Sequence, residues 1–311
     1  MEEAEYKVKA KAKSKEMQRT RVGLRSSLRK YRIRISRFWR LYRQSKMGVI
    51  GLVLLVTFVV VAIFAPYIAP YTPNDFFVGT SLESPSFQHL LGCDEIGRDI
   101  LSLLIYGTRI SLTVGLLASL GTVLIGTLVG LVAGYSGGRV DEALMRITDV
   151  ILMLPGIPLL IVFAAMLGAS LMNIITIIVI LTWAPTARVI RAQVLSMKER
   201  PFIEAARAVG GSDRHVIVHH ILPNVLPLVF TYMILNIPVA IVTEASLSFL
   251  GLGDVSAASW GMMLNFAFNA GAIDRWYYII PPGALITVLA FVFALIGHAM
   301  DEVINPRLRQ R

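Results

Sequence analysis

RISLTVGLLASLGTVLIGTLVGLVAG, residues 109–134, contains a single charged side chain, that of Arg109 at its start. About 20 consecutive apolar residues cross the ~30 Å hydrocarbon core of a bilayer as a helix. Within this stretch Gly126, Gly130 and Gly134 recur every fourth residue. Small residues at that spacing allow another helix backbone to approach closely. The stretch therefore predicts a membrane-spanning helix with a packing stripe of glycines.

Five further stretches are long and apolar enough to span a membrane: 47–69, 149–168, 171–187, 224–245 and 281–300. The composition agrees, because 55% of the 311 residues are hydrophobic and only 16% are charged. Soluble domains carry about 25% charged residues. We therefore expect an all-α polytopic membrane protein with six transmembrane helices, in which the third and fourth form a hairpin.

The positive charges predict how these helices are oriented. With the N-terminus in the cytoplasm, the cytoplasmic segments are 1–46, 135–148, 188–223 and 301–311, and they hold 27 of the 30 Lys and Arg residues. Cytoplasmic loops of membrane proteins carry such an excess of Lys and Arg. Both termini are therefore expected to be cytoplasmic.

The same topology divides the chain into parts. Residues 1–46 form a basic tail, 47–108 the first span with an outside segment, 109–300 the transmembrane core, and 301–311 a second tail. The outside segments 70–108 and 246–280 are long, and long connections in compact proteins are usually functional. We expect them to form an entrance collar that faces an extracytoplasmic partner.

The N-terminal tail is strongly basic, since residues 1–47 hold 16 Lys and Arg residues against four Glu. Such a segment, with aromatic residues interspersed, is found in nucleic-acid-binding proteins. A basic segment beside a first membrane helix is better explained by topology and by contact with anionic lipid. We expect membrane lipid as its partner and no nucleic acid.

No metal, cofactor or catalytic site is expected in this chain. The single cysteine, Cys93, has no cysteine with which to form an internal disulfide. His89, His215 and His219 are scattered, without the spacing of metal ligands. A phosphate-binding loop of the G-x-x-x-x-G-K-[ST] type is also missing from the sequence.

The most informative cytoplasmic stretch is KERPFIEAARAVGGSD, residues 198–213, within the loop 198–223. Pro201 suits the first turn of a helix and Gly210 suits its end. On this helix, residues 201–210, an apolar face recurs at i, i+3, i+4 and i+7: Phe202, Ala205, Ala206 and Val209. The pattern fits a knob that docks into a cleft of another protein, and it equally fits a helix lying on the membrane surface.

A family resemblance distinguishes these two interpretations. The segment Glu204-Ala205-Ala206, followed by Gly210 and Leu222-Pro223, resembles the cytoplasmic loop of permeases of ATP-binding-cassette (ABC) importers. Further blocks resemble the C-type permease subunit of the dipeptide/oligopeptide/nickel importer group: HLLGCDEIGRD (89–99), YGTRISL (106–112), GGRVDE (137–142), EASLSFLGLG (244–253), SWG (259–261) and NPRLR (305–309). The likeness covers about residues 45–311.

This resemblance implies a type I ABC importer permease fold in the cell inner membrane. It also implies that the helix 201–210 docks on a cytoplasmic ATPase, with Glu204 as the polar contact and Gly210 as the bend. The implied partners are a second homologous permease, two ABC ATPase subunits that carry ATP and Mg²⁺, and an extracytoplasmic solute-binding protein. The implied cargo is di- or oligopeptides, with oligosaccharides or nickel complexes as alternatives.

Two other classes of protein fit the residues less well. The string Gly134-Tyr135-Ser136-Gly137 is similar to a serine-hydrolase motif, but serine chemistry needs a base within reach in a sheltered site. Secondary transporters place ionisable or broken-helix sites near the bilayer midplane. The expected spans here are almost free of ionisable residues, with Asp149, Glu244 and His298 near their ends.

Overall fold

The computed structural model describes residues 39–304, so most of the basic tail and the NPRLR block lie outside the described residues. Between these limits the chain is helical, with one isolated β-bridge between Cys93 and Asp99 and no strand. The helices are α2 (Lys46–Ile68), α3 (Ile100–Ser136), α4 (Gly138–Met153), α5 (Gly156–Leu167), α6 (Leu171–Thr182), α7 (Ala184–Lys198), α8 (Pro201–Ala208), α9 (Asp213–Val216), the π-helix η1 (Ile217–Ile221), α10 (Leu222–Phe249), α11 (Trp260–Asn269) and α12 (Trp276–Ile304).

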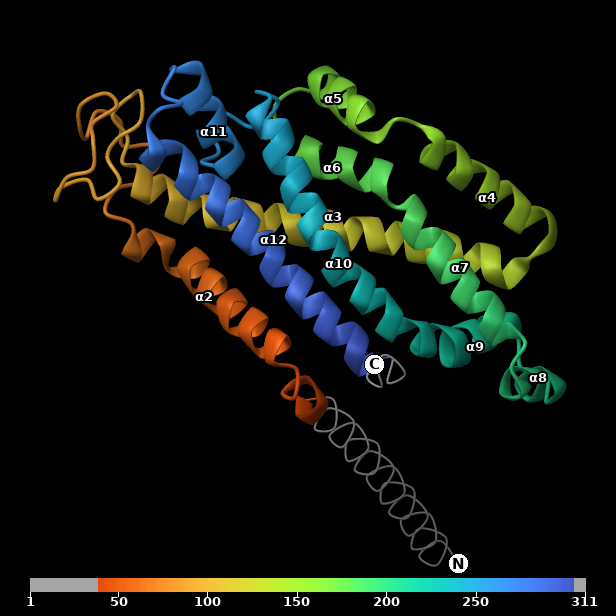
Figure 1. Ribbon diagram of the computed structural model, residues 1–311. Coiled ribbons are helices and arrows are strands. Elements are labelled where there is room, and N and C mark those ends of the chain that lie inside the picture. Colours follow the sequence, from red (N-terminus) through yellow and green to blue (C-terminus); the bar gives the residue numbers. More distant parts are fainter. Residues whose placement is uncertain (1–38, 305–311) are drawn as a thin grey trace, which may run out of the picture.

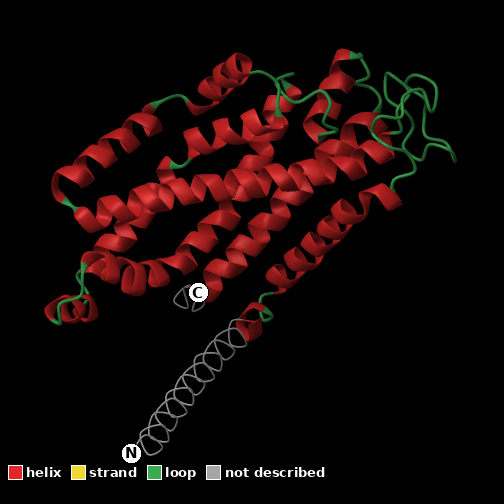
Figure 2. Ribbon diagram, turned by 180° about the vertical axis from the view of Figure 1, so that it is seen from behind, coloured by secondary structure: helices red, strands yellow, loops and turns green. Residues whose placement is uncertain are grey.

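Helix α3 is the central element, and it packs against α7, α10, α2, α6 and α4 (Figure 1). On one side α2, α10 and α12 run along it, and on the other side lie the two hairpin arms α4–α5 and α6–α7 (Figure 2). About half of the apolar span of α3 is buried inside the chain. The remaining spans bury a smaller share and leave apolar side chains at the outer surface, as a lipid environment requires.

The glycine stripe of α3 faces α7. A Cβ atom added to Gly130 would lie 2.5 Å from the carbonyl oxygen of Ala187, and one added to Gly126 would lie 2.8 Å from that of Trp183. At Gly134 the nearest atoms are the carbonyl oxygen of Arg191 and Val194 Cβ, both 2.9 Å away. The structure thus places all three glycines against one neighbouring helix, where any side chain would push the two backbones apart.

We expect the substitution Gly130→Ala to lower the thermal stability of the permease, whereas Gly283→Ala will not. Overpacking a close helix contact costs about 1–3 kcal/mol. Gly283 lies within α12 with no atom within 4 Å of an added Cβ, so alanine there is neutral or stabilises the helix by up to ~1 kcal/mol. Thermal unfolding of the two variants in detergent measures this difference. Equal melting temperatures would show that the stripe does not set the α3–α7 distance.

Six spans are present if each bent pair of helices counts as one. The helices α2, α3 and α12 and the continuous run Asp213–Phe249 are long and apolar enough to cross a membrane. The expected third span is the pair α4 and α5, which is bent by 87°, and the fourth is the pair α6 and α7, which is bent by 45°. The first bend follows extended backbone at Leu154 and Pro155, and the second coincides with Pro185 in the first turn of α7.

Ion pairs join the two arms of this hairpin at the α4–α7 side. Both side-chain nitrogens Nε and Nη2 of Arg191 bind the carboxylate of Asp141, at 2.5 and 2.6 Å. Arg188 Nη2 donates to Asp149 at 2.5 Å. Paired, bidentate contacts of this kind fix geometry as well as charge. The charged residues near the ends of these arms therefore act as packing contacts within the chain.

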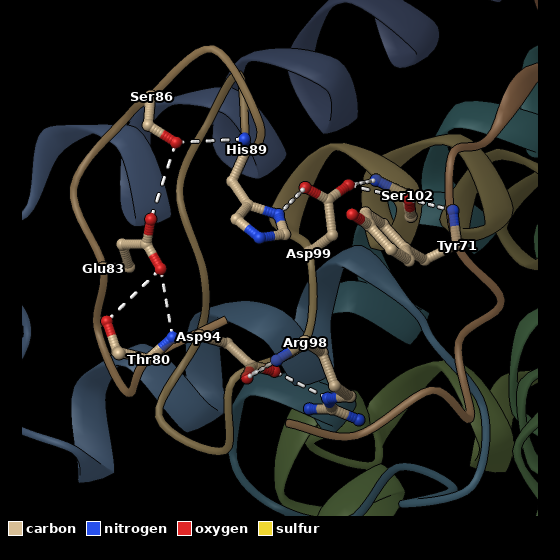
Figure 3. A network of polar contacts seen from close by, with 9 residues as sticks. All are labelled: Tyr71, Thr80, Glu83, Ser86, His89, Asp94, Arg98, Asp99 and Ser102. Carbon is tan, nitrogen blue, oxygen red and sulfur yellow. Dashed lines mark hydrogen bonds and ion pairs between the residues drawn. The ribbon is translucent and has the colours of Figure 1, made fainter. Parts of the chain in front are cut away.

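The loops and α11 gather at one end of the bundle, and α8 lies at the other (Figure 1). The loop between α2 and α3 is held by internal polar contacts: the Asp94 carboxylate accepts hydrogen bonds from the Arg98 backbone N and Nε at 2.8 and 2.6 Å (Figure 3). The loop is also fixed to α12, because Tyr278 donates its hydroxyl to Glu95 at 2.5 Å. The two long segments expected to form a collar therefore meet in one structured cap.

Candidate functional site: helix α8 and the loop that carries it

Helix α8 is two residues shorter than expected. It begins at Pro201, in the first-turn position that proline favours, and Ala208 is its last residue. Gly210 follows with φ of +86°, its N–H donates to the Arg207 carbonyl at 2.9 Å, and the Gly211 N–H donates to the Ala206 carbonyl at 3.0 Å. This pair of bonds around a left-handed residue is the Schellman motif. Gly210 is therefore the stop signal of α8 and the start of the bend toward α9.

The substitution Gly210→Val is expected to reduce import by roughly tenfold, because a β-branched residue in the left-handed region costs about 1–2 kcal/mol. No atom lies within 4 Å of a Cβ at this position, so the effect is conformational rather than steric. Gly210→Asn is the matched control, since asparagine tolerates the left-handed region. Initial rates of substrate uptake measure both variants. A valine variant as active as the asparagine variant would contradict this role.

A single side chain anchors α8 to the bundle. Ile203 is fully buried and belongs to a cluster with residues from α3, α7, α9, η1 and α10: Leu131, Tyr135, Ile190, Val194, Met197, Val216, Ile221 and Val225. The face of α8 on which Ile203 lies is therefore the inner one. Ile203 is therefore the contact that joins α8 to α3, α7 and the start of α10.

Polar contacts around Tyr135 brace the loop on either side of α8. The Tyr135 hydroxyl donates to Asp213 at the start of α9, and Lys198 Nζ donates to the Tyr135 carbonyl oxygen at 2.7 Å. The Arg207 guanidinium lies over the Tyr135 ring, 5.3 Å from its centroid. The end of α3 is thus connected to α7, α8 and α9. Sequence reasoning missed this network, since Tyr135 and Asp213 lie far apart in the chain without a common motif.

The outer face of α8 is the apolar one expected from the sequence. Phe202, Ala205 and Val209 are exposed, and the side chain of Val209 is 86% accessible. Together with residues of the following turn and helices they line an open hollow of about 690 Å³, formed by Phe202, Ala205, Ala206, Val209, Gly210, Gly211, Ser212, His215 and His220. An exposed apolar patch of this kind marks an interaction surface.

Glu204 lies in the first turn of α8 and is exposed. Among residues 39–304 its carboxylate has neither a hydrogen-bond nor an ion-pair partner within the chain. Its charge is therefore available to an external partner. The structure brings Glu204 together with Phe202, Ala205 and Ala206 on α8 and with Val209 directly after it, while the glycines of α3 lie elsewhere, against α7.

Known protein families match the chain in two places. The family described as Binding-protein-dependent transport system inner membrane component matches residues 126–310, which include α8 and its hollow. The family described as N-terminal TM domain of oligopeptide transport permease C matches residues 34–85, which include α2. The two matches together cover five of the six expected spans and part of the remaining one.

Individual relatives are similar over most of their length. The dipeptide transport system permease protein of Bacillus subtilis (strain 168) is 34% identical over 273 residues, which are 88% of this chain and 85% of the relative. The glutathione transport system permease protein of Pectobacterium atrosepticum is 37% identical over 275 residues, 88% of this chain and 91% of the relative. A second dipeptide permease, from Alkalihalophilus pseudofirmus, is 35% identical over 268 residues, 86% of this chain and 88% of the relative.

Proposed function

The chain belongs to the family of binding-protein-dependent transport system inner membrane components, and from this premise we propose that α8 couples it to an ATPase subunit. A member of this family is a transport permease of the inner membrane and not an enzyme, and it works with a substrate-binding protein and an ATPase. The proposal adds which residues dock: Phe202, Glu204, Ala205, Ala206 and Val209, with Gly210 ending the helix.

The observation that carries this proposal is the division of α8 into two faces. Ile203 is buried in the bundle, whereas Phe202 and Val209 are exposed beside an open hollow. An isolated eight-residue helix is unstable in water, so α8 depends on its anchor. The small side chain of exposed Ala205, with the partly buried Ala206 beside it in the hollow, permits a close approach by a partner. This arrangement is suited to receiving a force at one face and delivering it at the other.

We further propose that this chain forms half of a translocation path together with a second, homologous permease. Six spans of one chain are too few to enclose a peptide-sized path. Two ATPase subunits would close on ATP, draw the two docked helices together, and switch the rigid bundles from inward- to outward-facing. The ATP and Mg²⁺ belong to those subunits. The solute-binding protein would rest on the cap formed by the loop end and α11.

This assembly requires α8 and the loop end to lie on opposite sides of the membrane. We expect the variant Phe87→Cys to react with a membrane-impermeant maleimide in intact cells, because Phe87 is fully exposed at the loop end. Val209→Cys is expected to react only after permeabilisation. The native Cys93 is buried and serves as the unlabelled background. Labelling of Val209→Cys in intact cells would contradict the cytoplasmic position of α8.

The proposed cargo is di- or oligopeptides, because the similar relatives include dipeptide and glutathione permeases. The test is uptake of a radiolabelled dipeptide by cells that contain or lack this chain, with unlabelled peptides, an oligosaccharide and a nickel complex as competitors. Uptake that depends on the chain and is reduced only by peptides is the expected result. If uptake were reduced by the oligosaccharide or by the nickel complex and not by unlabelled peptides, that competitor would be the cargo and the peptide proposal would be wrong.

A further inference from the structure

The loop between α2 and α3 contains a cluster of three side chains that differ in chemistry. A carboxylate oxygen of Glu83, a ring nitrogen of His89 and the sulfur of Cys93 all lie within 4.8 Å of one another. His89 and Cys93 are buried, with accessible fractions of 2% and 0%. Ligand atoms of a tetrahedral zinc ion lie about 2.0–2.3 Å from the metal and hence roughly 3.3–3.8 Å apart. A small contraction would bring the three atoms to that spacing.

The backbone of the loop brings these residues together. The Cys93 N–H donates to the Glu83 carbonyl at 3.1 Å, and the Gly92 N–H donates to the His89 carbonyl at 2.8 Å. Gly92 has φ of +73°, and a Cβ there would lie 2.1 Å from the Glu83 carbonyl oxygen. The turn that connects the three side chains is therefore closed by bonds independent of the side chains themselves.

Gly79 lies directly against the three ligand atoms. A Cβ atom added to Gly79 would be 2.5 Å from Cys93 Sγ, 2.8 Å from Glu83 Oε2 and 3.0 Å from His89 Nε2. These contacts identify the atoms that converge, and they show that a side chain at residue 79 would push the three apart. The nitrogen that faces the cluster is Nε2, the one left free by the other contact of the ring.

Neighbouring groups orient two of the three side chains (Figure 3). His89 lies between Glu83 and Asp99, and its Nδ1 is 3.1 Å from Asp99 Oδ1. The Glu83 Oε2 atom accepts hydrogen bonds from the backbone N and the hydroxyl of Thr80, at 3.0 and 3.3 Å. A histidine held at one nitrogen by a carboxylate, with the other nitrogen directed at a metal, is the usual arrangement in zinc proteins.

We propose that Glu83 Oε2, His89 Nε2 and Cys93 Sγ bind a divalent transition-metal ion of the zinc type. Thiolate, imidazole and carboxylate are the three side-chain groups that Zn²⁺ prefers, and Mg²⁺ and Ca²⁺ avoid thiolates. One thiolate, one carboxylate and a neutral imidazole balance the two positive charges of the ion. A water molecule completes the tetrahedron.

The charges around the cluster favour a cation. The carboxylates of Glu83, Asp99 and Asp94 act on the Cys93 thiol, and negative charge of this kind beside a thiol attracts a positive ion. Spacing in the sequence does not predict the cluster, because its members follow one another at six and four residues in an irregular loop. The ion would fasten the loop to the start of α3 through Asp99, whose carboxylate also caps that helix. The proposal depends on this loop alone and is independent of how α8 functions.

The test uses the purified full-length chain in detergent, stripped of metal by a chelator. Zn²⁺ binding is measured by competition with a chromogenic chelator, and Co²⁺ is used as a spectroscopic probe. We expect one strongly bound Zn²⁺ per chain and a Co²⁺ spectrum with a thiolate charge-transfer band in the near ultraviolet. Cys93→Ser and Gly79→Ala are expected to weaken binding at least tenfold and to remove that band. Asp75→Asn, which changes an exposed residue of the same loop that is not in the cluster, is the control and binds as the native chain does.

Three results would overturn the proposal. The first is no stoichiometric Zn²⁺ binding by the native chain. The second is a Co²⁺ spectrum without the thiolate band, which would exclude Cys93 as a ligand of the bound ion. The third is a band that persists in Cys93→Ser. Gly79→Ala retains all three ligands, so it tests the site even if Cys93→Ser fails to fold, and metal-free melting temperatures report on folding.

Discussion

Glu204→Arg is expected to abolish substrate-stimulated ATP hydrolysis while the permease remains folded in the membrane. Glu204 is exposed on α8 and has no partner among the described residues of its own chain, so its reversal disturbs the docking contact and not the fold. Placing like charges opposite each other in an interface costs about 2 kcal/mol or more. That cost corresponds to about thirtyfold weaker docking.

The measurement is the ATPase rate of the reconstituted complex with and without substrate-loaded binding protein, together with co-purification of the ATPase. The matched control is Glu199→Arg, which makes the same change of charge on an exposed residue at the end of α7, before α8 begins. We expect the control to retain coupling. Full stimulated hydrolysis in Glu204→Arg would exclude Glu204 from the docking surface.

Ile203→Ala is expected to leave docking of the ATPase on α8 intact but to interrupt the transfer of movement from α8 to the bundle. The substitution leaves the outer face of α8 unchanged but removes the only fully buried side chain of that helix. Truncation of a buried isoleucine to alanine costs about 2–5 kcal/mol. The ATPase should therefore still co-purify, but the binding protein should no longer stimulate hydrolysis, because α8 moves without displacing α3, α7 and α10.

Hydrogen exchange of residues 201–211 and the stimulated ATPase rate check this expectation together. Exchange in α8 should increase, whereas the core of α3 keeps its protection. Ile203→Leu is the conservative control, since volume-conserving apolar exchanges usually cost less than 1.5 kcal/mol. If Ile203→Ala retained normal stimulation, force would have to reach the bundle by a route other than the Ile203 cluster.

Hydropathy predicted the six apolar stretches, which give four continuous spans and two bent pairs of helices, but it did not predict their shapes. Helix α3 begins at Ile100 rather than at 109, because residues 100–108 pack against α11 and Trp260 donates its indole N–H to the Leu104 carbonyl. A window of apolar residues does not distinguish a span from a buried extension of it. Likewise, Pro155 and Pro185 lie at bends, whereas Pro227 and Pro238 lie inside the continuous helix α10. Neighbouring helices decide which proline bends a span.

The sequence predicted the docking residues of α8 but not the contacts that hold α8 to the bundle. Periodicity selected Phe202, Ala205, Ala206 and Val209 as one apolar face. All but Ala206 are exposed, and Ala206 is partly buried against the Ile203 cluster. Periodicity did not identify Ile203 as the buried anchor, because a helix of two turns presents apolar residues on both sides. Contacts such as Tyr135 with Asp213 join segments far apart in the chain, and no local pattern encodes them.

Cysteine cross-linking at Val209 tests most directly that α8 is the docking element. Val209 is exposed beside the hollow, and the only native cysteine, Cys93, is buried in the loop between α2 and α3. In the assembled complex, Val209→Cys carrying a short bifunctional cross-linker should yield one product, the permease joined to its ATPase subunit, and ATP should change the yield. Phe87→Cys at the loop end should yield no such product. If Val209→Cys fails to cross-link to the ATPase while the complex is intact, the docking surface lies elsewhere.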